Sequence, residues 1–341
     1  MIKIAVDAMG GDYAPSAPVE GVYYALKEVE DIEIYLVGKK EQLEEEISRI
    51  DPEKVAATRW EIIDAREVIG ADENPTTAIK EKSEASMVKC MELVKSGTVH
   101  AMISAGNTGA FMAGGLLKVG RLPGIKRPAL APIFPTFDGR GTVVLDVGAT
   151  MDPKPEHLRD FGIMGSLYAQ KVLDRETPRV ALINVGEEPG KGNTLAKETY
   201  QKLNEAPVHF IGNIEARDLL SGEIDVAVCE GFMGNVLLKF LEGIGKNMFQ
   251  AMKEEFTADV RGKIGAYILK PGLKKIHARF DYNEYGGAPF LGIDGVLVKS
   301  HGSSKAAAFK NAIKKQGYQF VKHEVLSSFS QGLKKGAITD E

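Results

Sequence analysis

The segment IKIAVDAMGGD, residues 2–12, shows the pattern that decides the fold of the whole chain. Its apolar run Ile2–Val6 predicts a buried β-strand, and the acidic and glycine residues after it predict a loop. Apart from Lys3 every residue of this run is apolar, which is typical of a parallel strand that is covered on both faces. In an open α/β sheet, the loop that follows such a strand lies at the edge where ligands bind.

The same alternation of strand, glycine-rich loop and helix recurs along the chain. Further strands are expected at Ile32–Val37, Val99–Ser104, Thr142–Val147, Val180–Val185, Ile224–Cys229 and Gly295–Lys299, and helices near 39–49, 76–96, 155–172, 194–205 and 234–256. This alternation predicts an α/β fold with an open, largely parallel, Rossmann-like sheet. We expect one catalytic unit over residues 1–333, with a smaller helical lobe protruding at 235–285 and a flexible tail at 334–341.

The composition is that of a folded enzyme in a reducing compartment. Of the 341 residues, 44% are hydrophobic and 26% charged, which excludes global disorder. The net charge of −4 argues against binding nucleic acid through bulk charge. Cys90 and Cys229 are too few for a disulfide scaffold or a zinc site of paired cysteines. We read no signal peptide or membrane-spanning segment and expect a cytoplasmic protein.

Five more glycine loops follow expected strands. They are ISAGNTGA (103–110), LDVGATMDPKPEH (145–157), INVGEEPGKGN (183–193), VCEGFMGN (228–235) and VKSHGSS (298–304). One such loop is typical of any tight turn between a strand and a helix. Six of them favour a site for phosphate or another oxyanion, because glycine lets backbone N–H groups approach an anion at a helix N-terminus.

Several common motifs are missing from these loops. The sequence contains no phosphate-binding G-x-x-x-x-G-K-[ST], no dinucleotide fingerprint and no G-x-S-x-G nucleophile elbow. The six histidines are scattered, so no His/Cys cluster has the spacing of metal ligands. We therefore expect no nucleotide cofactor and no tightly bound metal, while a loosely held divalent cation stays open.

A set of sequence blocks resembles one family over nearly the whole chain. The blocks are DAMGGDYAP (7–15), SAGNTGAFMA (104–113), RPALAP (127–132), LDVGAT (145–150), PEHL (155–158), NVGEEPGKGN (184–193), FIGNIEARD (210–218), CEGFMGNVLLK (229–239), DYNEYGGAPFLG (281–292) and HGSS (301–304). In this order they resemble the PlsX-type phosphate acyltransferases. Two positions depart from the family pattern: Lys80 stands where arginine is expected, and Glu230 where aspartate is usual.

The resemblance implies a reversible acyl transfer in bacterial phospholipid synthesis. A fatty acyl group would pass from the thioester of acyl carrier protein to inorganic phosphate, giving acyl phosphate for a membrane acyltransferase that acylates glycerol 3-phosphate. It also implies a homodimer at the cytoplasmic membrane face, with a fold like those of isocitrate and isopropylmalate dehydrogenases and phosphotransacetylases.

Phosphate attack on a thioester needs placement and charge control more than a strong nucleophile. We expect catalytic roles for Lys191, Asn193, His301 and Asp146. The residues expected to bind phosphate or substrate are Asp7, Gly10, Gly11, Asp12, Ser104, Gly106, Asn107, Thr108, Gly109, Glu187, Asn213, Glu230, Gly234, Asn235, Gly286 and Gly287.

Several of these residues could instead have structural roles. His301 could donate to an oxyanion or cap the next helix, and Asp146 could act as a base or organise its loop. Asp7 and Asp12 could orient loop amides or serve as helix caps. We expect a structural hydrogen bond from His157 and a buried core position for Cys229, which has no paired histidine to activate it.

The segment VRGKIGAYILKPGLKKIHARF, Val260–Phe280, mixes cations with large apolar side chains and contains no acid. We expect its residues Arg261, Lys263, Leu269, Lys270, Leu273, Lys274, Lys275 and Arg279 to contact a partner. Pro271-Gly272 should break a helix and expose Leu269 and Leu273 at a tip. Contact with anionic lipid is preferred over a dock for acidic carrier protein or a solvated edge.

Three other functions compete with this interpretation. A phosphotransacetylase would use coenzyme A as the acyl carrier. A decarboxylating dehydrogenase would need metal-binding aspartates and a cofactor loop, which we do not find. A scaffold that binds carrier protein would not need several convergent anion-binding turns.

Overall fold

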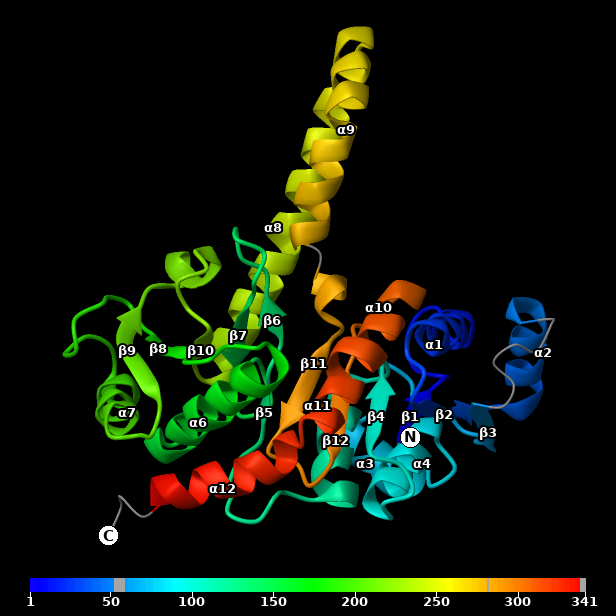
Figure 1. Ribbon diagram of the computed structural model, residues 1–341, viewed down its shortest axis with the longest axis horizontal. Coiled ribbons are helices and arrows are strands. Elements are labelled where there is room, and N and C mark those ends of the chain that lie inside the picture. Colours follow the sequence, from blue (N-terminus) through cyan, green and yellow to red (C-terminus); the bar gives the residue numbers. More distant parts are fainter. Residues whose placement is uncertain (52–58, 281, 338–341) are drawn as a thin grey trace.

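Two mostly parallel β-sheets form the framework of the protein in the computed structural model (Figure 1). The structure describes residues 1–51, 59–280 and 282–337. The first sheet has the order β3-β2-β1-β4-β12-β11-β5, and the second has the order β6-β7-β10-β8-β9. The strands are β1 (Ile2–Asp7), β2 (Ile32–Gly38), β3 (Trp60–Asp64), β4 (Ala101–Ser104), β5 (Ala129–Leu130), β6 (Ile133–Phe134), β7 (Thr142–Leu145), β8 (Arg179–Ile183), β9 (His209–Ile214), β10 (Val226–Val228), β11 (Ala288–Leu291) and β12 (Val296–Lys299). The expected α/β class is confirmed, with its strands divided between two sheets.

Helices connect most of the parallel strands. They are α1 (Ser16–Glu28), α2 (Lys40–Ile50), α3 (Pro75–Glu81), α4 (Ser86–Lys95), α5 (Thr108–Gly114), α6 (Pro155–Val172), α7 (Thr194–Asn204), α8 (Gly231–Thr257), α9 (Val260–Phe280), α10 (Ala306–Asn311), α11 (Tyr318–Lys322) and α12 (Val325–Ala337). The single helix expected at 76–96 is two helices, α3 and α4. The expected tail starts later than residue 334, because α12 continues to Ala337; residues 338–341 lie outside the described residues.

The strand directions bring distant loops together. In the first sheet, β1 and β12 both pair in parallel with β4, so the carboxyl ends of these three strands lie at one edge. In the second sheet, β7, β10, β8 and β9 are parallel neighbours. The chain crosses from the first sheet to the second at Ala131 and Pro132, which separate β5 from β6, and it returns through the helices between β10 and β11.

Buried side chains cover both faces of the sheets. Along β1, Ile4 and Val6 belong to one hydrophobic cluster, while Ala5 between them belongs to the other. This period of two follows from the alternation of side chains along a strand. It explains why several of the strands are continuous apolar runs in the sequence, as predicted.

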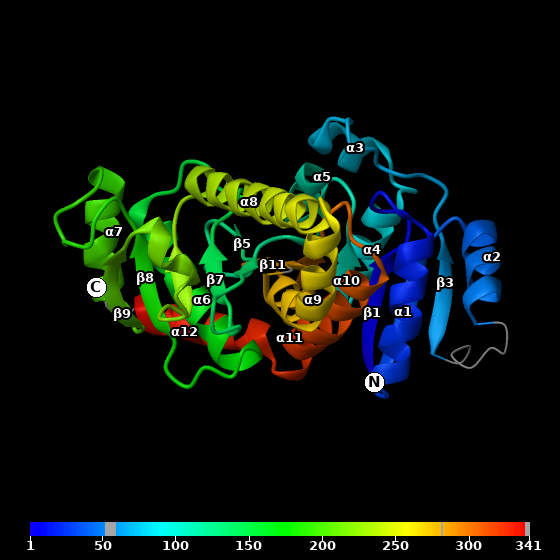
Figure 2. The ribbon, with the colours of Figure 1, turned by 90° about the horizontal axis from the view of Figure 1, so that it is seen from above.

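Helices α8 and α9 form a hairpin that projects from the body of the molecule (Figures 1 and 2). The chain reverses at Ala258 and Asp259, and α9 continues through Pro271 without a break. The expected helix break at Pro271-Gly272 is therefore wrong, and the tip of the hairpin lies about a dozen residues earlier. Neither helix, nor any other in the described chain, is long and apolar enough to cross a membrane.

Candidate active site

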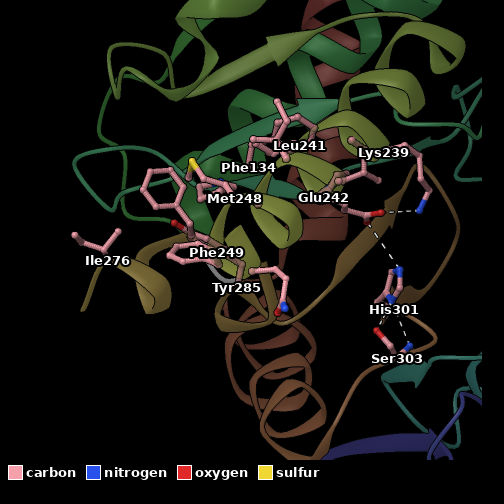
Figure 3. A pocket seen from close by; sticks show the side chains of 18 of the residues that line it. Phe134, Lys239, Leu241, Glu242, Met248, Phe249, Ile276, Tyr285, His301 and Ser303 are labelled. Atoms are coloured by element: carbon pink, nitrogen blue, oxygen red, sulfur yellow. Dashed lines mark hydrogen bonds and ion pairs between the residues drawn. The ribbon is translucent and has the colours of Figure 1, made fainter. Parts of the chain in front are cut away.

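A cavity of about 1890 Å³ lies at the base of the α8–α9 hairpin, between the hairpin and the two sheets. Its walls come from α8, α9, the β5–β6 connection and the loop after β12. Figure 3 shows Phe134, Leu241, Met248, Phe249 and Ile276 along its apolar part. The cavity therefore joins an extended apolar wall to the carboxyl end of β12.

Charged and hydroxyl groups gather at one end of this cavity (Figure 3). Lys239 Nζ lies 2.8 Å from Glu242 Oε2, and Glu242 Oε1 lies 3.9 Å from His301 Nε2. On the other side of the ring, His301 Nδ1 accepts a hydrogen bond from Ser303 N at 3.2 Å. Burial lowers the pKa of His301, which favours a neutral imidazole with its proton on Nε2.

Lys299 and Ser300 form the floor of the same polar end. Lys299 is 7% exposed, and burial lowers the pKa of its ammonium group to about 8. Ser300 is 1% exposed, and its Oγ is buried with no hydrogen-bond partner in the described part of the chain. Gly287 has φ +91°, and a Cβ there would lie 2.6 Å from the Lys299 carbonyl oxygen. Glycine at 287 thus allows the backbone to pack closely against Lys299.

Asp7 organises the loop edge from beneath. Its carboxylate accepts hydrogen bonds from Ser86 Oγ at 2.6 Å, from Ser104 Oγ at 2.7 Å and from Met9 N at 3.2 Å. Burial raises the pKa of Asp7, and these donors oppose the rise. Because its oxygens are committed to the loops, Asp7 orients the site rather than lining the cavity.

The glycine loops after β1, β4 and β12 meet one another at this edge. A Cβ on Gly10 would lie 2.7 Å from Gly106 N, and one on Gly11, which has φ +100°, would lie 3.0 Å from the Gly302 carbonyl oxygen. Asp12 N donates a hydrogen bond to that same oxygen at 2.8 Å. Glycine is therefore required here for packing between loops, in addition to any approach to an anion.

At the start of α5, some of the predicted site residues hold the loop and helix in place, and one lines the cavity. Asn107 Oδ1 accepts from Ala110 N at 3.0 Å and caps the helix, while its Nδ2 donates to Gly70 O at 3.1 Å. Thr108 lines the cavity. Gly109 allows close contact with Pro75, because a Cβ would lie 2.6 Å from that ring. Gly286, at φ +83°, packs in the same way against the backbone of Asn311.

The second sheet contributes Asp146, Glu230, Gly234 and Asn235. Asp146 is fully buried; its oxygens accept from Leu130 N at 2.8 Å and from Thr150 N at 2.6 Å, and burial raises its pKa to about 6. This geometry is that of a loop organiser.

Glu230 is the N-cap of α8 and accepts from Phe232 N at 2.6 Å and Met233 N at 2.8 Å. Gly234 permits α8 to contact the Asp146 carbonyl, and Asn235 lines the cavity. Of these four residues, Asn235 is the one in position to meet a substrate.

Four other predicted site residues lie around β8 and β9, at the far edge of the second sheet. Lys191 Nζ is 4.0 Å from Glu188 Oε1 on the surface, and Asn193 Oδ1 caps α7 by accepting from Ala196 N at 2.9 Å. Asn213 Nδ2 donates to Glu188 O at 2.8 Å, and Glu187 is exposed. None of these four is among the described residues that line the cavity. The structure thus does not bring them to the polar end.

The basic segment has two faces. Lys263, Lys270, Leu273 and Lys274 line the cavity, so Leu273 is not exposed at a tip as expected. Leu269 is 56% exposed on the other face, with Arg261 and Lys275 also exposed. Arg279 Nη1 donates to Phe137 O at 2.7 Å and fixes the base of α9 to the body.

Sequence reasoning missed Lys239, Glu242, Lys299, Ser300 and Ser303. The sequence position of Lys299 could have indicated a functional role, because a lysine at the end of a fully apolar strand is expected to be buried, and burying its charge is costly. Nothing in the sequence distinguishes Lys239 and Glu242 as site residues, since charged residues three apart are common on exposed helix faces.

The remaining candidates have structural roles. Cys90 and Cys229 are buried, and burial raises the pKa of both thiols, in agreement with the expected core position of Cys229. His157 Nδ1 accepts from Lys154 N at 3.0 Å at the start of α6, as expected. In residues 1–51, 59–280 and 282–337, no three His, Cys, Asp or Glu side chains are grouped to hold a metal ion.

Comparisons with known proteins show the family to which the chain belongs. Residues 2–328 match the model of a family described as "Fatty acid synthesis protein". The chain is 48% identical over 332 residues to a phosphate acyltransferase of Exiguobacterium sp., covering 97% of this chain and 98% of that protein. A phosphate acyltransferase of Clostridium perfringens is 45% identical and covers 100% of this chain and 99% of its own length.

Among solved structures, the EutD phosphotransacetylase from Staphylococcus aureus matches with a TM-score of 0.59 at 12% identity, covering 93% of this chain and 94% of that one. This likeness confirms the expected phosphotransacetylase-like fold.

Proposed function

The chain belongs to the fatty acid synthesis protein family and is a phosphate acyltransferase of lipid synthesis, and on this premise we propose its substrates and mechanism. The acyl donor is the thioester of acyl carrier protein, the acceptor is inorganic phosphate, and the transfer is reversible. The product is an acyl phosphate, which a membrane glycerol-3-phosphate acyltransferase consumes in the synthesis of phosphatidic acid.

One observation carries this proposal: a single cavity joins a cationic, hydroxyl-rich end to a long apolar wall. Phosphate matches the polar end, and a fatty acyl chain matches the wall of α8 and α9. Each methylene buried from water contributes about 0.8 kcal/mol, so a long chain binds the wall strongly. The thioester carbonyl then lies where the two parts meet.

The polar groups suit phosphate attack on that carbonyl. Lys239 and Lys299 offset the charge of phosphate, and His301 Nε2–H is placed to donate to the oxyanion that forms on the carbonyl. The glycine loops after β1, β4 and β12 hold this edge in place. The balance needs no nucleotide cofactor, because phosphate is the nucleophile and the thiol is the leaving group.

The test is phosphate-dependent loss of thioester from palmitoyl carrier protein and palmitoyl-CoA, run in parallel with hydroxylamine trapping of the product. We expect hydroxamate only when phosphate and the carrier thioester are both present. Turnover with CoA alone would replace carrier protein by coenzyme A as the donor.

We also propose that the exposed face of α9 holds the enzyme at the cytoplasmic face of the membrane. Val260, Ile264 and Ile268 are each more than half exposed and are not among the residues that line the cavity, and lysine and arginine are interleaved with them. Such a surface binds anionic lipid through both charge and buried apolar area.

Ile264→Glu/Ile268→Glu should lose co-sedimentation with phosphatidylglycerol vesicles. The body variant Leu116→Glu/Leu117→Glu, also at exposed positions, should retain it. Equal binding by both variants would reject the membrane contact. Loss of carrier binding instead would assign the face to carrier protein.

The homodimer is proposed on a stripe of α8. Phe232, Val236 and Phe240 recur every four residues, are each more than half exposed and are not among the residues that line the cavity. A second copy of the chain would cover this stripe by helix–helix packing. Sedimentation equilibrium should find a dimer that Phe240→Lys dissociates and Tyr24→Lys, at an exposed position on α1, does not. A monomeric wild type would overturn this assignment.

A further inference from the structure

Lys299 is a buried lysine at the junction of the polar end and the sheet. It ends β12, is 7% exposed and pairs in register with Ser104 of β4 and Ala288 of β11. Long cationic side chains are almost never fully buried unless they are paired. The position of this lysine therefore calls for a functional explanation.

The contacts of Lys299 do not supply one. Its Nζ donates to the Ser300 carbonyl oxygen, and within the described chain no carboxylate lies within 4.0 Å of Nζ. Asp7 is the nearby acid with the strongest effect on it, but the Asp7 oxygens already accept bonds from Ser86 and Ser104. An ammonium group is thus held in the cavity floor by one carbonyl, without an ion-pair partner.

Ser300 provides a second, independent observation. Its Oγ is buried, lines the cavity and has no partner among the described residues. Buried hydroxyl groups are nearly always hydrogen-bonded in folded proteins. A hydroxyl left unsatisfied in a cavity floor is completed when a polar substrate atom binds beside it.

We propose that Lys299 carries the proton from the attacking phosphate to the departing thiolate, with Ser300 Oγ donating a hydrogen bond to the substrate oxygen beside it. This inference rests on the proposed function. It assigns proton transfer in that reaction to Lys299, which lies outside the glycine loops after β1 and β4.

The proton balance of the reaction fits one carrier. An oxygen of hydrogenphosphate attacks the thioester carbonyl carbon, a C–O bond forms, and the C–S bond breaks with its electron pair on sulfur. The product acyl phosphate lacks the proton of hydrogenphosphate, and the thiolate gains one to become the thiol. Lys299 accepts the first proton and delivers the second, so it ends each cycle unchanged.

The surroundings place Lys299 near the range where both of its protonation states are populated. Burial lowers its pKa and so does Lys239 on α8, whereas Asp7 and Asp12 raise it, and the balance is about 8. A group with a pKa near the working pH is an efficient general acid and base. The ring of His301, engaged by Ser303 and facing Glu242, is placed to stabilise the oxyanion instead.

A leaving-group comparison tests the proposal. An aryl thioester releases a thiolate that needs no proton, whereas the carrier and CoA thioesters release a thiolate that does. In Lys299→Arg, which keeps the charge but does not deprotonate, we expect kcat for palmitoyl carrier protein to fall about 100-fold. For the palmitoyl aryl thioester the fall should be clearly smaller, because only the acceptance of the phosphate proton is then lost, and the alkaline-side pH dependence near 8 should disappear.

Two controls keep the outcomes separate. Lys239→Met removes a cation from the same cavity and should raise the KM for phosphate equally with both thioesters. Ser300→Ala removes no internal hydrogen bond, so it should fold normally and lower kcat about 10-fold. Equal losses for both thioesters in Lys299→Arg, or an unchanged rate in Ser300→Ala, would overturn the proposal. Wild-type enzyme without phosphate-dependent turnover would overturn the proposed function instead.

Discussion

Gly245 offers a direct test of where the acyl chain lies. It lines the cavity from α8, and a Cβ added there would meet no described atom within 4 Å. Gly245 is ten residues after Asn235, which is about 15 Å along the helix axis from the polar end. A leucine at this position should therefore enter the cavity without a clash and block its distal part.

The expected effect depends on acyl chain length. Displacing about four methylenes of a palmitoyl chain costs about 3 kcal/mol at about 0.8 kcal/mol each. That corresponds to a roughly 150-fold loss of kcat/KM. An octanoyl chain is half as long and ends before the obstruction, so its kcat/KM should change little.

The measurement is kcat/KM for palmitoyl and octanoyl carrier protein with Gly245→Leu. The matched control is Gly265→Leu on α9, where an added Cβ also meets no described atom within 4 Å and where the residue is not one of those found lining the cavity. Both substitutions improve helix propensity by a similar amount. An equal palmitoyl-to-octanoyl ratio in the two variants would refute the placement of the chain along α8.

Three further results are expected. Burial raises the folded-state pKa of Asp146 to about 6 from 3.8, so its contribution to stability is fully present below the unfolded pKa and is lost as the pH rises through 6. Urea unfolding should show wild type losing about 2 kcal/mol relative to Asp146→Asn between pH 4 and 7, and a constant difference would contradict this. Glu230→Ala removes the cap of α8 and should lower the free energy of unfolding by about 1 kcal/mol while Glu187→Ala, on an exposed loop, leaves it unchanged. The thiols of Cys90 and Cys229 are buried with raised pKa values, so iodoacetamide at neutral pH should leave the native enzyme active; rapid inactivation would show that one of them is reactive.

The sequence predicted which loops lie at the cavity better than which side chains line it. Loops after β1, β4 and β12 were correctly expected at one edge, because parallel strands end on the same side. His301, Thr108, Asn235 and Gly287 were named and do line the cavity. Lys191 and Asn193 were named on the same reasoning, yet β8 lies near the far edge of a second sheet, and the order of strands in a sheet is not written in local sequence.

In the α8–α9 hairpin, a prediction from local sequence was itself wrong. Pro271 in a basic, apolar segment predicted a helix break, but α9 continues through it because the missing N–H is the loss of one hydrogen bond in a helix of 21 residues. The reversal instead falls at Ala258 and Asp259, where Asp259 Oδ1 accepts from Gly262 N at 2.6 Å and starts the new helix.

The sequence by itself determined the α/β class, the family and the glycine loops, because hydrophobic period, turn chemistry and motif order are local properties. Tertiary structure decided which polar groups meet in the cavity. Lys299 and Ser300 acquire their chemistry from burial, and Lys239 and Glu242 acquire theirs from the position of α8 over the sheet edge. Burial and juxtaposition arise between residues far apart in the chain, so they exist once the two sheets and the hairpin have assembled.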